Sequence, residues 1–176
     1  KCLDAMAYTM FRLVECQELM IILSERGLLV AADDEPTALQ LVLAPHGIMF
    51  HGRSSFQLGR FDLAREDLRR LLVRGRLNLV GQDRCVVLQG IALIGCLLED
   101  WEVMGEAARN LKDAPENQSY PFFTGLGKFF YGKYLFELGR IEDAEEEMTQ
   151  GYEKHMLHEG GLLFQSFQAW HRGELL

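Results

Sequence analysis

Apolar residues along the chain recur every three to four positions, in segments of about 15 to 25 residues that short polar turns separate. The strict alternation typical of half-buried strands is weak throughout. The pattern therefore predicts an all-α fold, in which helices are expected over residues 3–14, 17–31, 37–58, 61–74, 84–98, 101–111, 122–138, 141–156 and 162–176. Asp83 is the expected N-cap of the fifth helix, because a side-chain oxygen there can accept from free backbone N–H groups.

Two stretches eighty residues apart are nearly the same, Phe56-Gln-Leu-Gly-Arg-Phe-Asp-Leu-Ala64 and Phe136-Glu-Leu-Gly-Arg-Ile-Glu-Asp-Ala144. A degenerate third copy, Cys96-Leu-Leu-Glu-Asp-Trp-Glu-Val-Met104, lies halfway between them. Each stretch spans a predicted turn between two helices, so the helices form hairpins that recur every forty residues. A period of this length is typical of stacked repeats, which usually bind partners rather than catalyse reactions.

Residues of one kind also recur at equivalent places in the three hairpins. Where two antiparallel helices cross closely, a side chain larger than a methyl group forces the backbones apart. The small residues expected on the first helix of each hairpin are Gly52, Ala92 and Gly132. Their counterparts on the second helix are Ala64, Met104 and Ala144. An apolar residue that plugs the end of the hairpin is expected just after the turn, at Phe61, Trp101 and Ile141.

These residues resemble the tetratricopeptide pattern of a small residue on the first helix, a glycine in the turn and an alanine on the second helix. The period of forty differs from the family's period of about 34, and no repeat has the family's proline after the second helix. Forty residues also fits HEAT and armadillo repeats, which remain the alternative fold. The resemblance implies an all-α, right-handed superhelix of antiparallel helix pairs, a TPR-like solenoid of about four and a half repeats, in a single domain over residues 1–176.

A narrower resemblance is carried by Phe56 to Leu68 and by Phe167-Gln-Ala-Trp-His-Arg-Gly173. Both look like the repeat arrays at the C-terminus of multidomain bacterial regulators that also carry an ATPase and a DNA-binding or cyclase domain. In that family the array is the sensory or partner-binding region, and this chain contains no phosphate-loop motif. We therefore expect a fragment of a longer protein. The apolar terminal helix predicts either a continuing array or a homodimer through that end.

The resemblance implies a binding surface on the concave side of the array, lined by the first helix of each pair. Arg53 and Lys133 beside aromatic residues suit a peptide carboxylate or acidic side chains. The plainer alternative is that the aromatic residues only pack one repeat onto the next. The expected binding residues are Tyr8, Arg12, Met49, Arg53, Gln57, Gln89, Leu93, Phe129, Lys133, Glu137 and Trp170.

Composition narrows the class of function. The net charge of −8 disfavours nonspecific binding to nucleic acid or to anionic membranes. Four cysteines without a Cys-x-x-Cys pair indicate a reducing compartment, so we expect the cytoplasm. No acid–base pair, nucleophile or metal-ligand set stands out, which predicts a protein without catalytic activity, cofactor or metal. A protein or peptide partner is expected; a stand-alone TPR chaperone or adaptor, such as one that holds secretion substrates, is the alternative.

Two features invite a more specific chemistry. The segment Thr124-Gly-Leu-Gly-Lys128 raises the hypothesis of an anion bound at a helix N-terminus. The helix after Phe61 is rich in arginine, and the helix after Ile141 is rich in glutamate. These charges are expected to be solvated outer faces; the alternative is attraction between the two ends of different molecules, or between the arginine row and an acidic partner.

Overall fold

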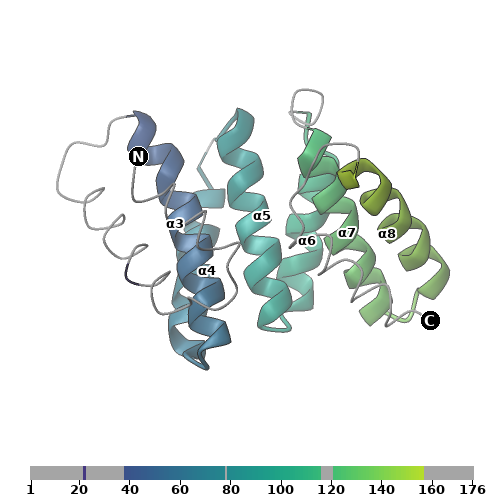
Figure 1. Cartoon of the computed structure of the whole chain (residues 1–176), viewed down its shortest axis with the longest axis horizontal. Coiled ribbons are helices and arrows are strands. Elements are labelled where there is room, and N and C mark those ends of the chain that lie inside the picture. The colour runs from purple at the N-terminus through teal and green to yellow at the C-terminus, as the bar shows by residue number, and fades with distance from the viewer. Residues whose placement is uncertain (1–21, 23–37, 78, 116–120, 157–176) are drawn as a thin grey trace. The chain divides into compact units, whose positions relative to one another are not determined.

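The computed structural model describes residue 22 and residues 38–77, 79–115 and 121–156 (Figure 1). The chain divides into two compact units, Lys1–Leu79 and Val80–Leu176. Over the described ranges the regular elements are helices and no strand occurs, which confirms the all-α prediction there. Apart from Ile22, which is helical, the predicted helices over 3–14, 17–31 and 162–176 lie outside the described residues. None of the helices described is both long and apolar enough to cross a bilayer.

The first unit contains one described helix pair, α3 (Ala38–Gln57) and α4 (Phe61–Gly75), which pack against each other. Pro45 lies inside α3, and the helix continues through it. On α4 the fully or nearly fully buried apolar residues are Ala64, Leu68 and Leu71, three to four positions apart. That spacing is the stripe of an amphipathic helix that buries one face.

The second unit contains α5 (Gly81–Leu97), α6 (Trp101–Lys112), α7 (Pro121–Glu137) and α8 (Ile141–Met156). Each helix packs against the next, and α5 also packs against α7. One core cluster between α5, α6 and α7 consists of Cys85, Val86, Leu111, Ala114, Phe123 and Leu126. The bounds of these four helices agree with the predicted ranges 84–98, 101–111, 122–138 and 141–156 to within about three residues.

The start of α5 differs from the prediction. Val80 occupies the N-cap position in an extended conformation, and Gly81 follows with φ +65°. Asp83 lies in the first turn rather than at the cap, so its prediction as the N-cap was wrong. Its carboxylate there is still favourable, because the positive end of the helix dipole lies at the N-terminus.

The two helices of a pair differ in how they are buried. On α5 every residue from Cys85 to Cys96 except Leu88 is buried. On α6 the buried residues follow one side: Met104, Gly105, Ala107, Ala108 and Leu111. A helix that is apolar all round lies inside a structure, and an amphipathic one covers it. In the second unit, α5 is therefore an inner helix and α6 an outer helix.

The three turns have one geometry, which confirms the forty-residue period. Gly59, Glu99 and Gly139 occupy equivalent positions and have φ values of +74°, +58° and +75°. In each turn the next residue donates its N–H to the carbonyl five residues earlier: Arg60 to Ser55 at 2.8 Å, Asp100 to Gly95 at 2.9 Å and Arg140 to Leu135 at 2.9 Å. This is the Schellman arrangement, in which a left-handed residue closes the helix C-terminus.

The predicted small residues are buried at helix crossings. Ala64, Ala92, Met104 and Ala144 are completely buried, and Gly52 and Gly132 are buried. A Cβ atom at Gly132 would lie 2.6 Å from the Met148 side chain and 3.0 Å from the Ala144 carbonyl oxygen. The plug prediction is only partly confirmed. Phe61 stacks edge-on against Phe56 with 5.3 Å between ring centroids, yet it stays 47% exposed.

Glycines also bring α6, α7 and α8 close together. A Cβ atom at Gly127 of α7 would lie 2.4 Å from the backbone nitrogen of Lys112, the last residue of α6. A Cβ atom at Gly151 of α8 would lie 2.8 Å from the carbonyl oxygen of Gly125. Both contacts are with backbone atoms, so no rotamer change of the neighbour can make room.

Candidate functional site

The expected binding residues fall into three groups. Tyr8, Arg12 and Trp170 lie outside the described residues. A second group lies on α3 of the first unit: Met49, Arg53 and Gln57. The third group lies on α5 and α7 of the second unit: Gln89, Leu93, Phe129, Lys133 and Glu137.

In the first unit the three residues differ in exposure. Met49 is buried in the core and Gln57 is exposed, whereas Arg53 is half-buried between these extremes. Burial lowers the pKa of the Arg53 guanidinium to about 10, since desolvation penalises the charged form. Arg53 therefore remains a cation at neutral pH, held close to the apolar side of α3.

In the second unit the predicted residues come from two helices in direct contact, α5 and α7. Gln89, Leu93, Phe129 and Lys133 are buried, and Glu137 is exposed at the end of α7. Gln89 and Lys133 are polar residues on the buried parts of these helices. Burying such groups costs free energy unless they are paired, so each needs a structural or functional reason.

Lys133 has the most developed surroundings of the predicted residues. It is only 8% exposed, and its ammonium forms an ion pair with Glu137 Oε1 at 2.9 Å, one helical turn later. The ammonium also lies 5.0 Å from the ring centroid of Phe136 and 6.0 Å from that of Trp101. The face of an aromatic ring attracts a cation, so carboxylate and rings together compensate the loss of water.

Trp101 is the residue of this site that sequence reasoning assigned differently. It begins α6, and the repeat pattern indicated only that it plugs the end of a hairpin. Its proximity to Lys133 depends on how α6 packs against α7, which spacing along the chain does not reveal.

A buried polar pair in the first unit was also missed. His51 Nδ1 of α3 contacts Asp67 Oδ2 of α4, both side chains being almost fully buried. Arg70 Nη1 donates to the other carboxylate oxygen of Asp67 at 3.3 Å. The repeat register contained a signal, because forty and eighty residues beyond Asp67 stand Ala107 and Glu147, so that two of three repeats have an acidic residue there.

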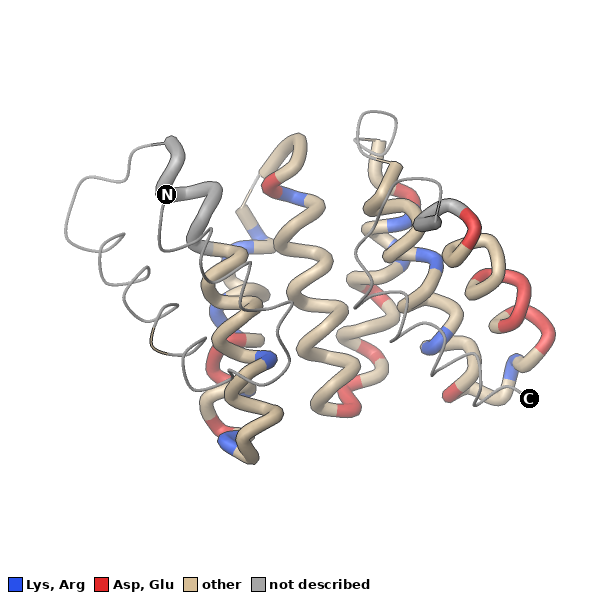
Figure 2. Tube along the Cα trace, in the orientation of Figure 1, with Lys and Arg blue, Asp and Glu red and all other residues tan. Residues whose placement is uncertain are grey.

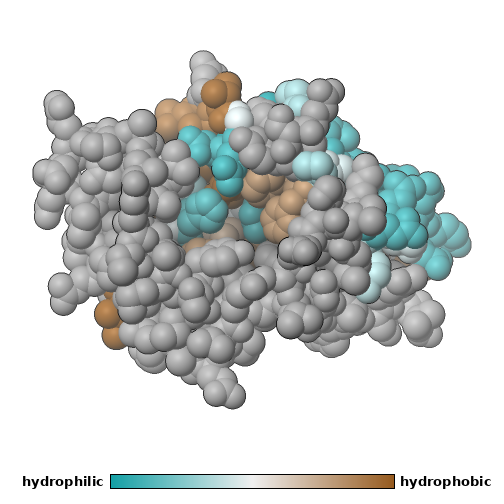
Figure 3. Space-filling model, turned by 45° about the horizontal axis from the view of Figure 1, so that its top comes forward, coloured by the Kyte–Doolittle hydropathy of each residue, from teal (hydrophilic) through white to brown (hydrophobic). Residues whose placement is uncertain are grey.

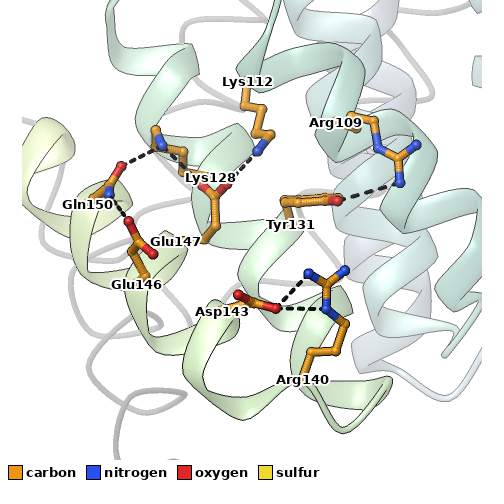
Figure 4. A network of polar contacts seen from close by, with 9 residues as sticks. All are labelled: Arg109, Lys112, Lys128, Tyr131, Arg140, Asp143, Glu146, Glu147 and Gln150. Atoms are coloured by element: carbon orange, nitrogen blue, oxygen red, sulfur yellow. Dashed lines mark hydrogen bonds and ion pairs between the residues drawn. The ribbon is translucent and has the colours of Figure 1, made fainter.

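Glu147 is the centre of a polar network that joins α6, α7 and α8 (Figure 4). It pairs with Lys112 through one carboxylate oxygen and with Lys128 Nζ at 3.1 Å through the other. Burial raises the pKa of Glu147, but hydrogen bonds and Coulomb attraction from the two lysines outweigh burial, so the net pKa is lowered. Lys128 also donates to Gln150 at 2.7 Å, and Lys112 lies 4.2 Å from the ring centroid of Tyr131.

This network bears on the anion hypothesis for residues 124–128. The segment lies within α7, which begins at Pro121, so its backbone N–H groups are past the first three residues of the helix. Gly127 faces the Lys112 backbone, and Lys128 is occupied by Glu147 and Gln150. The segment therefore serves helix packing, and the anion-site hypothesis for it was wrong.

The charged rows lie on α4 and α8 (Figure 2). On α4 the arginines form ion pairs one turn apart with acidic residues of the same helix, such as Arg65 with Asp62 at 3.3 Å and Arg69 with Glu66 at 2.9 Å. On α8 the exposed acidic residues are Glu142, Asp143, Glu145, Glu146 and Glu153. Figure 3 shows hydrophilic residues gathered over the end of the second unit that carries α8.

Within the described residues no group of three or more histidine, cysteine or acidic side chains is arranged to hold a metal ion. Cys85 and Cys96 are buried cysteines that are not part of a disulfide. Comparison of the chain with protein-family models, with curated proteins and with solved structures gave no match.

Proposed function

We propose that the chain is a non-catalytic recognition module, a TPR-like array of helix pairs wound into a right-handed superhelix, and that it binds a protein, a peptide or a small ligand. Support comes from the identical turns at Gly59, Glu99 and Gly139 and from the alternation of inner and outer helices in the second unit. Repeat stacks of this kind offer extended binding surfaces made by equivalent positions of successive units.

The observation that carries the proposal is the setting of Lys133. An ammonium at this depth is costly, and replacing a buried ion pair with apolar residues often leaves stability unchanged or improved. Stability alone therefore gives no reason to retain Lys133 between Phe136 and Trp101. Arg53 occupies the same repeat position eighty residues earlier and is a half-buried cation.

The ligand of this site carries a carboxylate. Glu137 is the outer member of the ion pair, its side chain 27% exposed against 10% for Lys133, and a ligand carboxylate replaces it on the ammonium. The rings of Trp101 and Phe136 then contact the apolar part of the ligand. In a bacterial signalling or transcription regulator, such binding makes this array the sensory or partner-binding region.

The test uses peptides with a free C-terminal carboxylate and the same peptides amidated, with binding followed by the fluorescence of Trp101 in a Trp170→Phe background. Preferential binding of the free carboxylates is expected, with loss of binding in Lys133→Gln and tighter binding in Glu137→Gln, which lacks the internal competitor. Arg109→Gln, at an exposed cation of α6, is the matched control. Equal binding of both peptide sets, or unchanged binding by Lys133→Gln, contradicts the proposal.

A further inference from the structure

The outer face of α4 has a positive charge that its own acidic residues do not cancel. Residues 60–76 hold six arginines against three carboxylates, which leaves a surplus of three positive charges; the arginines are Arg60, Arg65, Arg69, Arg70, Arg74 and Arg76, and the carboxylates are Asp62, Glu66 and the buried Asp67, which pairs with Arg70. Exposed ion pairs one turn apart are worth little and do not alter this sum. On a chain with net charge −8, such a surplus is a local exception.

The outer face of α8 has the opposite charge. Over residues 140–153, five exposed carboxylates stand against one exposed cation, Arg140, which leaves a surplus of four negative charges in that range. Glu147 is not counted, since Lys112 and Lys128 already pair with it inside the helix packing. Glu142 and Glu145 are both exposed to solvent on α8.

Both faces also expose apolar side chains beside the charges. On α4 these are Leu63 at 44% and Val73 at 62% exposure. Near the start of α8 they are Leu138 at 55% and Ile141 at 41%. Burying such groups supplies the favourable free energy that surface charges alone rarely supply.

We propose that the α4 outer face of one copy docks on the α8 outer face of a second copy. The partner is another copy because both complementary halves of the contact, similar in magnitude of charge and each edged by apolar residues, are present on one chain. The contact joins two different surfaces, so it is heterologous, and a bound pair still leaves one α4 face and one α8 face open. Association by this route adds copies one after another.

Salt dependence follows from the physics of the contact. Charges on exposed faces attract over about 10 Å at 0.1 M salt and over about 30 Å at 0.01 M salt. Electrostatic complementarity mainly sets the rate and specificity of association. Association is therefore expected at low ionic strength and is expected to weaken as salt is added.

Sedimentation velocity at low and physiological salt tests the proposal with two charge-reversed chains. One carries Arg65→Glu with Arg69→Glu on α4, and the other carries Glu142→Lys with Glu145→Lys on α8. Wild type is expected to sediment as assemblies whose size increases with protein concentration and that dissociate when salt is added. Each variant alone is expected to remain monomeric. In the first, the α4 surplus changes from three positive charges to one negative charge, and in the second the α8 surplus falls to zero, so neither variant has two complementary faces.

The equimolar mixture of the two reversed chains is the decisive sample. The unchanged acidic α8 face of the first variant complements the unchanged basic α4 face of the second, so the mixture is expected to regain salt-sensitive association. Circular dichroism establishes that both variants keep their helices, and Glu102→Lys with Glu106→Lys on α6 is the matched control that keeps wild-type association. A monomeric wild type at low salt, a variant that still self-associates, or a mixture that stays monomeric overturns the proposal.

Discussion

Replacing Glu99 with glycine is expected to stabilise the second unit. Glu99 has φ +58°, whereas the equivalent positions, with φ +74° and +75°, are Gly59 and Gly139. A residue with a Cβ atom pays about 1 to 2 kcal/mol in the left-handed region. Glycine removes that cost but gives the unfolded chain more freedom, which offsets about 0.5 to 1 kcal/mol. The net gain in free energy of unfolding is about 0.5 to 1 kcal/mol.

Urea unfolding followed by Trp101 fluorescence, in a Trp170→Phe background, measures this change next to the turn. A gain of this size corresponds to about 1 to 4 °C in Tm for a chain of this length. Glu99→Gln is the control for charge, since a carboxylate near the C-terminus of α5 opposes the helix dipole by a few tenths of a kcal/mol at most. The difference between the glycine and glutamine variants then isolates the backbone.

The matching substitution in the other direction is Gly139→Ala. An added Cβ atom there meets no atom within 4 Å, so only the backbone conformation can cause a loss. The expected loss is about 1 kcal/mol. A Glu99→Gly variant no more stable than Glu99→Gln, or a Gly139→Ala variant as stable as wild type, refutes the argument that the turn conformation is the cause.

Three further substitutions test the packing and the charges. Gly127→Ala is expected to cost about 3 kcal/mol in urea unfolding, because the methyl group meets the Lys112 backbone at 2.4 Å; a neutral result would show that α6 and α7 are not in this contact. Ser55→Ala is expected to stabilise by about 1 kcal/mol, since the buried Ser55 hydroxyl has no hydrogen-bond partner among the described residues, and a clear loss of stability would contradict that assignment. Glu147→Gln is expected to destabilise at neutral pH. Because the pKa of Glu147 is lowered in the folded state, its carboxylate contributes to the free energy of unfolding above the ordinary pKa of 4.5, and this contribution is lost as the pH falls through the folded pKa. The stabilities of wild type and Glu147→Gln should therefore converge in acid. A difference in stability that does not depend on pH would exclude the ion pairs as its source.

The turns and hairpins could be predicted from sequence because their determinants are local. Leu-Gly-Arg places glycine where the Schellman bonds form, and both glycine turns carry it. The third turn shows the limit of the motif, because Glu99 adopts the same conformation without glycine. The Asp83 prediction failed for the opposite reason: cap preference is a tendency of residue types, and here the extended conformation of Val80 determines where α5 begins.

In the candidate site too, contacts within one helix could be predicted from sequence, whereas contacts between helices could not. The pairing of Lys133 with Glu137 follows from their spacing of four residues on one helix. The approach of Trp101 to that ammonium does not, since it depends on two helices meeting at a particular rotation. His51 and Asp67 likewise meet only when α3 and α4 fold back on each other in one register, which periodicity alone does not specify.

The self-contained hydrogen bonding of each turn has a consequence for how such a chain can change in length. The bond that closes a turn spans six consecutive residues, as from Ser55 to Arg60, so the bend needs nothing from the rest of the protein. Tandem duplication of a forty-residue segment therefore inserts a bend that forms by itself, between helices that already have crossing partners of the right size. Such a chain should tolerate best the insertion or deletion of a whole forty-residue repeat. It should tolerate least the insertion or deletion of a few residues within a repeat.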